Sequence, residues 1–283
     1  MTRENAGTHR IAVGDFTVTA IHDGLLVAGL GIVSGVPEDV AAGTLARNYA
    51  AVPPEITVSA FLIGHAGGLA LVDTGSADKF GPGHGRLIAN MTTLGVAPAD
   101  ITTILLTHAH IDHCGGMTGP DGLALYPNAE VVLARAELEH CMDAAPVPEA
   151  RRAGKALAQA CLGAYRDRLR PIEDGAEGLA GIRLLALPGH TPGHGGWMVG
   201  SGADRLLIWG DVVHMPGLQF ARPDATVIYD LDPALAEASR RRALEMAATE
   251  RLLVAGHHLD FPAFGHIQRR VEGYSFTAVA WRP

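Results

Sequence analysis

Aromatic and charged side chains are both scarce in this 283-residue sequence, and it has no basic stripe. Aromatic residues make up 5% of the chain, charged residues 18% and hydrophobic residues 48%. The hydrophobic share is typical of a globular protein, so we expect a sizeable core and little disorder. The net charge of −8 argues against nucleic acid or an anionic membrane as a partner. Short arginine clusters at 151–152 and 240–242 lie in predicted helices, and we interpret both as solvated helix faces.

Cysteines and long apolar runs are also few. The three cysteines, Cys114, Cys141 and Cys161, are scattered, which indicates no disulfide framework and favours a reducing compartment. No apolar run approaches the roughly 18 residues that a membrane span requires. Residues 1–10 lack the apolar stretch of a signal peptide. We therefore expect a cytoplasmic protein without a membrane partner.

Short apolar strands alternate with helices and glycine-rich loops along the chain, which predicts a layered α/β fold. The region 25–54 is apolar, rich in glycine and proline, and predicted to be irregular. Strands are predicted at 16–21, 58–63, 69–72, 101–106, 130–134, 182–187, 196–199, 205–209 and 252–255, and helices at 86–94, 136–142, 149–169 and 233–249.

Histidine, in contrast, is abundant, with 14 copies. Four potential metal ligands, His108, His110, Asp112 and His113, follow the predicted strand 101–106 directly. On a strand, residues two apart share a face, so His108 and His110 can point to one place. The turn that follows can aim Asp112 and His113 at a neighbouring place. One segment could therefore supply ligands to two metal ions, although surface histidines in a loop are the simpler alternative.

Four ligands cannot complete the shells of two metals, and further donors follow other predicted strands. His190 lies in a Gly-rich turn, Asp211 follows the strand 205–209, and His257 and His258 follow the strand 252–255. A single histidine after a strand is more often a hydrogen-bonded loop residue than a ligand. Together, these strand ends indicate one metal site of histidine and carboxylate ligands.

The order His-x-His-x-Asp-His, then His, then Asp, then His resembles the signature of the metallo-β-lactamase superfamily. The resemblance runs from Asp73 to His258. It implies a four-layer αββα sandwich that forms a single domain over residues 1–283. It also implies that Asp73 supports the ligands from beneath, as carboxylates behind metal ligands do in general.

Further segments resemble the methyl parathion hydrolase and lactonase branch of that superfamily. They are Ser59-Ala60-Phe61-Leu62-Ile63, Leu71-Val72-Asp73-Thr74-Gly75, Phe80-Gly81-Pro82, Gln219-Phe220, Phe261-Pro262 and Gly265-His266-Ile267. The branch implies a homodimer. It also implies that residues 1–57 form an N-terminal extension that takes part in the dimer or in the pocket.

The resemblance implies two ligand sets joined by one carboxylate. The first metal would be held by His108, His110 and His190, the second by Asp112, His113 and His258, and both by Asp211. His257 remains the alternative to His258, and His194 is expected to orient its loop. All seven positions are nitrogen or oxygen donors, which suits Zn²⁺, with iron, cobalt and manganese left open. Cys114 is interpreted as a small buried residue.

Two metals about 4 Å apart can lower the pKa of a shared water to about 7 and activate it for attack on a carbonyl or phosphoryl centre. Asp112 would orient that water or carry its proton. His214 stands where related lactonases often have a tyrosine. It would bind the oxyanion or protonate the leaving group, and a solvent-facing loop histidine is the alternative.

The small aromatic content argues against an aromatic leaving-group pocket, so we expect a lactone or aryl ester as the substrate, with phosphotriesters as a side activity. The apolar segment 25–36, with Phe61, Trp197, Met215 and Leu218, is a candidate acyl or aryl pocket, and core packing is the alternative. On the same fold, a mononuclear iron persulfide dioxygenase and a glyoxalase-type thioester hydrolase remain alternative functions.

Overall fold

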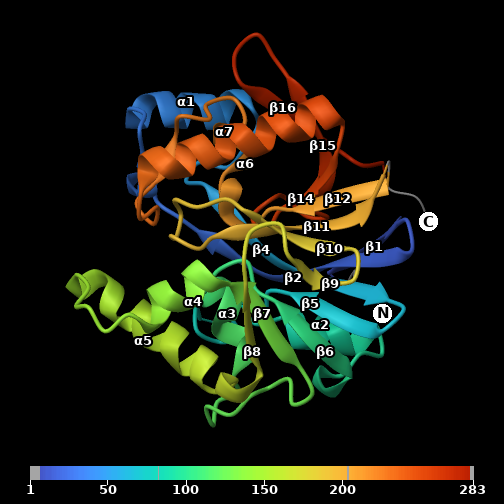
Figure 1. Cartoon of the computed structure of the whole chain (residues 1–283). Helices are drawn as coiled ribbons and strands as arrows, with labels where there is room; N and C mark the ends of the chain where they lie inside the picture. Colours follow the sequence, from blue (N-terminus) through green and yellow to red (C-terminus); the bar gives the residue numbers. More distant parts are fainter. Residues whose placement is uncertain (1–6, 82, 203, 281–283) are drawn as a thin grey trace, which may run out of the picture.

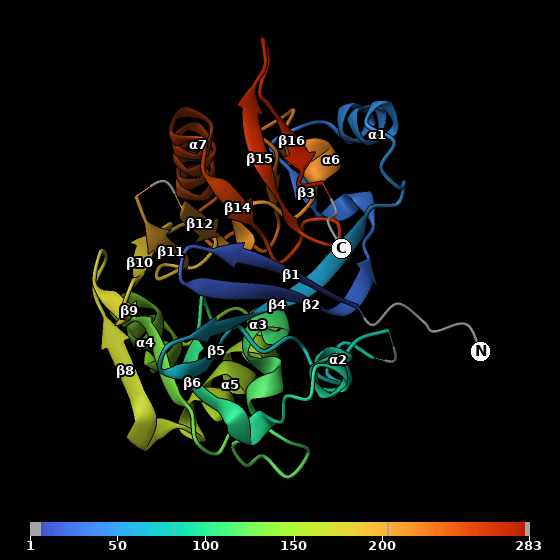
Figure 2. The ribbon, with the colours of Figure 1, turned by 90° about the vertical axis from the view of Figure 1, so that its right-hand side faces the viewer.

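The computed structural model describes residues 7–81, 83–202 and 204–280, and two seven-stranded β-sheets dominate it. The sheets pack face to face, with helices on the outer face of each, as Figure 1 and the turned view in Figure 2 show. The four-layer αββα sandwich expected from the sequence is therefore confirmed.

The first sheet has the strand order β1-β2-β4-β5-β6-β7-β8, and the chain enters it through antiparallel hairpins and continues in parallel strands from β5 onward. Its strands are β1 (Thr8–Val13), β2 (Phe16–Val27), β4 (Glu55–His65), β5 (Gly68–Val72), β6 (Ile101–Leu105), β7 (Glu130–Ala134) and β8 (Leu169–Ile172).

The second sheet has the order β16-β15-β14-β12-β11-β10-β9, and only the β12–β14 pair in it is parallel among the described residues. Its strands are β9 (Glu177–Leu179), β10 (Ile182–Ala186), β11 (Gly195–Ser201), β12 (Asp204–Ile208), β14 (Leu253–Ala255), β15 (Phe264–Arg269) and β16 (Tyr274–Ala278). A short separate pair joins β3 (Val33–Ser34) to β13 (Thr226–Val227).

Helices cover both outer faces of the sandwich. On the first sheet lie α2 (Leu87–Thr93), α3 (Ile111–Cys114), α4 (Arg135–Met142) and α5 (Glu149–Gly163). On the side of the second sheet lie α1 (Glu38–Arg47), α6 (Pro216–Gln219) and α7 (Pro233–Glu250). The 3-10 segments are η1 (Leu30–Ile32), η2 (Pro98–Asp100), η3 (Gly115–Met117), η4 (Arg166–Arg168) and η5 (Gly210–Val212). None of the helices in the described part of the chain is long and apolar enough to cross a membrane.

The first sheet is buried on both faces because its side chains alternate between two cores. On β6, Leu105 belongs to the core between the sheets, whereas Ile104 belongs to the core under the helices. On β7, Val132 and Leu133 divide in the same way. This explains why β7 is apolar from Val131 to Ala134 and why β6 is rich in β-branched residues, with Thr102 and Thr103 inside it.

Each strand and helix predicted from the sequence overlaps an element of the same type, but the N-terminal region differs from the expectation. β1 and β2 are integral strands of the first sheet, because β2 pairs with β4 along most of its length. The irregular segment expected at 25–54 contains α1, which follows Pro37 and has acidic residues in its first turn. A glycine and a threonine inside this helix weaken its pattern, so the sequence favoured a loop. Residues 1–6 of the predicted N-terminal extension lie outside the described residues.

The interpretation of 240–242 as a solvated helix face is wrong for Arg240, which is 1% exposed. Its Nε donates to the carbonyl oxygen of Val212 at 2.7 Å, and its Nη1 donates to those of Pro223 and Ala225 at 2.9 and 2.8 Å. Its Nη2 lies 3.8 Å from Asp230 Oδ2. The next two arginines of the cluster are exposed. Arg240 therefore ties α7 to the loops that precede and follow α6.

Replacing Arg240 by alanine should lower the free energy of unfolding by about 3 kcal/mol, because it leaves buried carbonyls and a buried carboxylate without a partner. Arg241→Ala, on the exposed side of the same helix, is the matched control and should change it by less than about 0.5 kcal/mol. Urea unfolding of both variants in the presence of a chelator measures the difference. Equal midpoints for the two variants would show that Arg240 has no such role.

Candidate metal centre

The loop after β6 carries the first donors, and its local structure differs from the expected one. β6 ends at Leu105, so His108 and His110 lie in an irregular loop and not on a strand. His110 has an extended backbone and directly precedes α3, the single helical turn that carries Asp112 and His113. The expectation that His108 and His110 share a strand face is therefore wrong. Their imidazoles nevertheless meet at a ring distance of 4.7 Å.

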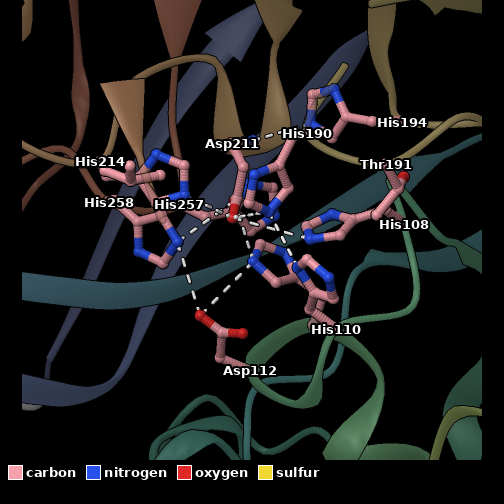
Figure 3. A network of polar contacts seen from close by, with 12 residues as sticks. His108, His110, Asp112, His190, Thr191, His194, Asp211, His214, His257 and His258 are labelled. Atoms are coloured by element: carbon pink, nitrogen blue, oxygen red, sulfur yellow. Dashed lines mark hydrogen bonds and ion pairs between the residues drawn. The ribbon is translucent and has the colours of Figure 1, made fainter. Parts of the chain in front are cut away.

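Asp211 lies at the centre of the site, in the turn between β12 and α6, and it is 4% exposed. Its Oδ2 lies 3.1 Å from the Nε2 atoms of both His190 and His214, and 3.6 Å from Nε2 of His108. His110 completes this side, because its Nδ1 is 2.8 Å from His190 Nε2. One carboxylate oxygen thus faces the imidazoles of His108, His190 and His214, and His110 lies beside His190 (Figure 3).

The other oxygen of Asp211 faces a second group. Oδ1 lies 2.9 Å from His113 Nε2 and 3.2 Å from His258 Nε2. Both of these imidazoles also approach Asp112 Oδ2, at 3.6 Å for His113 and 3.5 Å for His258. The two oxygens of one carboxylate therefore point to two different sets of donors.

All seven residues predicted as ligands fall into these sets. Donor atoms within 4.8 Å of one another form one group of His108, His110, His190 and Asp211, and another of Asp112, His113 and His258. His214 joins Asp211 and His258 in a further group. The sets mirror the assignment expected from the sequence.

Four of the imidazoles are oriented by a partner on the Nδ1 side, which leaves Nε2 free to face Asp211. The pairs are His108 with Thr107 Oγ1 (3.1 Å), His113 with Asp73 Oδ2 (2.6 Å), His190 with Asp230 Oδ1 (2.8 Å) and His258 with the carbonyl oxygen of Thr57 (2.7 Å). Partners of this kind favour the Nδ1–H tautomer and leave a lone pair on Nε2, as metal-binding histidines need.

The centre contains buried polar atoms that no protein group satisfies. His108 Nε2, His113 Nε2 and Asp211 Oδ1 are buried and have no hydrogen-bond partner among the described residues. His113 Nε2 and Asp211 Oδ1, for example, lie 2.9 Å apart but are not aligned as donor and acceptor. Buried polar atoms are normally paired, and lone pairs that converge without a donor fit a cation between them. The residues present therefore fit divalent metal ions with nitrogen and oxygen ligands.

The electrostatics of the first loop agree with this chemistry. Burial, together with the neighbouring imidazoles, holds the pKa values of His108 and His110 well below the usual range, so both rings are neutral. Burial also opposes the charged form of His113, but the carboxylates of Asp211, Asp112 and Asp73 raise its pKa well above the usual value. Three carboxylates around one histidine create a negative potential at this place, and that potential attracts cations.

Asp112 is the most accessible of the three carboxylates that face this centre. Its side chain is 15% exposed, compared with 3% for Asp211 and 0% for Asp73.

His214 does not face solvent, so the alternative of a solvated loop histidine is wrong. It is 4% exposed, and its ring stacks on that of His258 with centroids 5.1 Å apart. Its backbone N–H donates to Gln219 Oε1 at 2.7 Å, which fixes the residue in the turn before α6. Neither ring nitrogen has a hydrogen-bond partner in the described part of the chain.

The neighbouring histidines His257 and His194 occupy supporting positions. His257 Nε2 lies 2.9 Å from Asp73 Oδ2, and its ring packs edge-on against Phe61. His258, not His257, approaches both Asp112 and Asp211. His194 Nε2 accepts the backbone N–H of Asp211 at 2.9 Å, and its Nδ1 pairs with the carbonyl oxygen of Leu187 at 2.7 Å. His194 thus fixes the backbone of the central aspartate, close to its expected role.

The Asp211 turn also needs a glycine beside it. Gly210 has φ +58°, in the left-handed region that glycine adopts most readily. A Cβ at this position would lie 2.5 Å from His194 Nε2. Glycine therefore allows the imidazole of His194 to reach the backbone of Asp211.

Two buried carboxylates near the centre were not foreseen from the sequence. Asp230 pairs with His190, and Glu137 of α4 contacts the two loops that carry the first donor set. Neither stands in a motif, and a single acidic residue in a helix or loop usually faces solvent. Only their burial, 4% and 1% exposed, separates them from other acidic residues.

The pocket interpretation is wrong for Phe61, Trp197 and Leu218, which are buried in the hydrophobic cores. Met215, 2% exposed, packs in a core and also lines a cavity. Cys114 is buried as expected, and its Sγ faces the carbonyl oxygen of Ala109 instead of the metal-donor atoms.

The chain is similar to several known proteins. It is 30% identical to the human metallo-beta-lactamase domain-containing protein 1 over 204 residues, which cover 69% of this chain and 60% of that protein. It is 25% identical to an N-acyl homoserine lactonase of Bacillus cereus over 176 residues, which cover 62% of this chain and 63% of that protein. The chain thus spans about 60% of the length of these curated relatives.

Solved structures share the fold over nearly the whole chain. The hydrolase AbOPH, described as a beta-lactamase superfamily member, superposes with a TM-score of 0.93 at 28% identity, covering 99% of this chain and 100% of that one. The dizinc quorum-quenching lactonase AidC superposes with a TM-score of 0.92 at 23% identity, covering 98% and 99%. The family model of the metallo-beta-lactamase superfamily matches residues 53–257, which include six of the seven predicted ligands and end one residue before His258, and the chain belongs to this superfamily.

Proposed function

We propose that this chain is a hydrolase with two divalent metal ions that opens a lactone or an aryl ester. The observation that carries the proposal is the carboxylate of Asp211, whose two oxygens face two separate sets of buried donors. A carboxylate in this position can bridge two metals. Because every donor is nitrogen or oxygen, Zn²⁺ is the metal we propose first, and iron, cobalt and manganese are the alternatives.

In this proposal, His108, His110 and His190 hold one metal, Asp112, His113 and His258 hold the other, and Asp211 contacts both. When bound, such a pair of metals supplies Lewis acidity and lowers the pKa of water to about 7. The chain itself supplies orientation, because Asp73, Asp230 and Thr57 fix the imidazole rings from behind.

Asp112 accepts a hydrogen bond from the attacking water and receives its proton in this proposal. Its partial exposure supports the role, since a group that meets both solvent and substrate cannot be fully enclosed. The other two carboxylates have no such access.

His214 is proposed to donate a hydrogen bond to the substrate oxygen that becomes negative, or to protonate the leaving group. Its burial and its free ring nitrogens support this role, because a donor in a water-poor place stabilises charge strongly. Its Nε2 lies 3.1 Å from Asp211 Oδ2, so the ring reaches the centre of the site.

The substrate class rests on two observations. The chain is 25% identical over 62% of its length to a protein named an N-acyl homoserine lactonase. A cavity of about 410 Å³ is lined by Met215, the residue that follows His214 in the sequence, together with Leu45 and Tyr49. We propose that the part of the substrate remote from the reacting carbonyl occupies this cavity, which makes the α1 region part of the pocket. Phosphotriesters are proposed as a side activity only.

The second donor set favours a dinuclear hydrolase over a mononuclear iron persulfide dioxygenase. A single iron would need only the first set, and Asp112, His113 and His258 would then be buried together without a ligand, which is costly. A thioester hydrolase of the glyoxalase type would share both sets, so thioesters belong in the activity panel.

Asp211→Ala should reduce bound metal from two ions per chain to one or fewer. It should also slow lactone hydrolysis by roughly 100-fold or more, because it removes the carboxylate that both metals share. Plasma emission spectroscopy and a panel of lactones, aryl esters, thioesters and phosphotriesters measure both effects. Asp167→Ala, whose side chain is 89% exposed, is the control and should behave as the parent protein. A parent protein that binds metal but hydrolyses none of the panel would refute the substrate proposal.

His214→Phe should keep both metals and lower kcat by about 100-fold with little change in KM, because it removes a donor that acts in the transition state. His266→Phe, at an exposed position of β15, is the matched control. Metal analysis accompanies the kinetics. If the His214 variant loses a metal ion, the residue is a ligand and the catalytic role is wrong.

The homodimer also remains a proposal, and exposed apolar side chains in the N-terminal region support it. Val27, Tyr49 and Val52 are 60%, 98% and 48% exposed, which is unusual for large apolar residues that lie near one another in sequence. Light scattering at micromolar concentration should give about twice the mass of one chain. A mass equal to that of one chain would contradict the proposal.

A further inference from the structure

Glu137 of α4 connects two loops that are 80 residues apart in the sequence. Its Oε1 accepts the backbone N–H of Ala109 at 2.9 Å, and its Oε2 accepts the hydroxyl of Thr191 at 2.6 Å. Ala109 stands between His108 and His110, and Thr191 follows His190. One buried carboxylate therefore holds both loops that carry the first donor set.

The backbone of Glu137 also contacts the loop that carries His190, at Gly193. A Cβ on Gly193 would lie 2.0 Å from the backbone nitrogen of Glu137, so only glycine lets this loop rest directly on the start of α4. Glu137 is 1% exposed, which keeps water from competing for its two oxygens. Hydrogen bonds from a neutral donor to a buried carboxylate are among the stronger ones in proteins.

The second donor set has different supports. His113 pairs with Asp73, and His258 pairs with the carbonyl oxygen of Thr57. None of the hydrogen bonds recorded for Glu137 reaches the residues of that set. Losing the Glu137 carboxylate should therefore disturb the two halves of the centre unequally.

We propose that Glu137 is a positioning residue that sets the distance between the His108–His110 loop and the His190 loop, and thereby controls the affinity of the first metal position alone. This inference rests on the proposed dinuclear function. Glu137 touches neither metal nor substrate, and it acts through the backbone of Ala109 and the hydroxyl of Thr191.

The test measures metal affinity in two backgrounds that isolate each position. His258→Ala removes a ligand of the second set and His110→Ala removes one of the first. In each background, Glu137→Ala is compared with its parent by titrating Zn²⁺ or Co²⁺ against a chromophoric chelator. We expect 10- to 100-fold weaker binding in the His258→Ala background, as for other residues that orient metal ligands, and no change in the His110→Ala background.

Three controls separate positioning from general destabilisation. Glu137→Gln keeps an oxygen for the Ala109 N–H and offers an N–H to Thr191 Oγ1, so it should bind metal within about threefold of its parent. Thr191→Val removes one of the two hydrogen bonds and should give a smaller loss than Glu137→Ala. Glu139→Ala, on the exposed side of the same helix, should have no effect.

Thermal unfolding of the metal-free proteins shows whether each variant folds. If Glu137→Ala does not fold, Thr191→Val in the same two backgrounds decides the question. Equal weakening in both backgrounds, or none in either, would overturn the inference. The parent chain is titrated alongside, and failure to bind two metals there would refute the proposed function itself, whereas two metals with an inert Glu137 would refute only this inference.

Discussion

The carboxylate of Asp211 is the constraint on which the rest of the site depends. It is buried in the turn after β12, and each of its oxygens faces a different group of imidazoles. A buried carboxylate without positive charge or donors around it would be strongly destabilising. The molecule surrounds it with histidines and fixes its backbone through His194. Several buried donor atoms there, among them His108 Nε2 and Asp211 Oδ1, have no hydrogen-bond partner in the described part of the chain, and a cation between them would satisfy these atoms.

The two-sheet architecture explains how such a centre arises from scattered residues. In the first sheet, β6 leads into the loop with His108 and then into α3. The second sheet supplies Asp211 after β12 and His258 after β14, and these two strands are adjacent and parallel. Because the sheets pack face to face, the ends of these strands meet at one edge of the sandwich. Neither sheet alone contains a full donor set, so the centre also links the two halves of the chain.

The sequence was sufficient to single out the histidines and aspartates that the structure brings together, because their signal is local. The spacing of His108, His110, Asp112 and His113 is short, and each later donor follows an apolar strand. The four-layer fold followed from the family that this order resembles. The strand β1, the second half of β2 and the helix α1 were harder to predict, because glycine, proline and weak periodicity obscure their patterns.

The supports of the centre could not be read from the sequence, for a physical reason. Glu137 and Arg240 lie on helices whose other charged residues face solvent, and nothing in their immediate sequence distinguishes them. Their roles depend on hydrogen bonds to residues 15 to 54 positions away along the chain. Glycines such as Gly193 and Gly210 belong to the same class, since their importance lies in what a Cβ would meet. Such contacts become visible only in three dimensions.

The central claim is that Asp211 stands between two metal ions. The most direct measurement is a crystal structure of the zinc-loaded protein, with anomalous difference maps collected on both sides of the zinc absorption edge. We predict two peaks about 3.5 to 4 Å apart, one on each side of the Asp211 carboxylate, as in other two-metal hydrolytic centres. A single peak beside His108, His110 and His190, with none beside His113 and His258, would contradict the account.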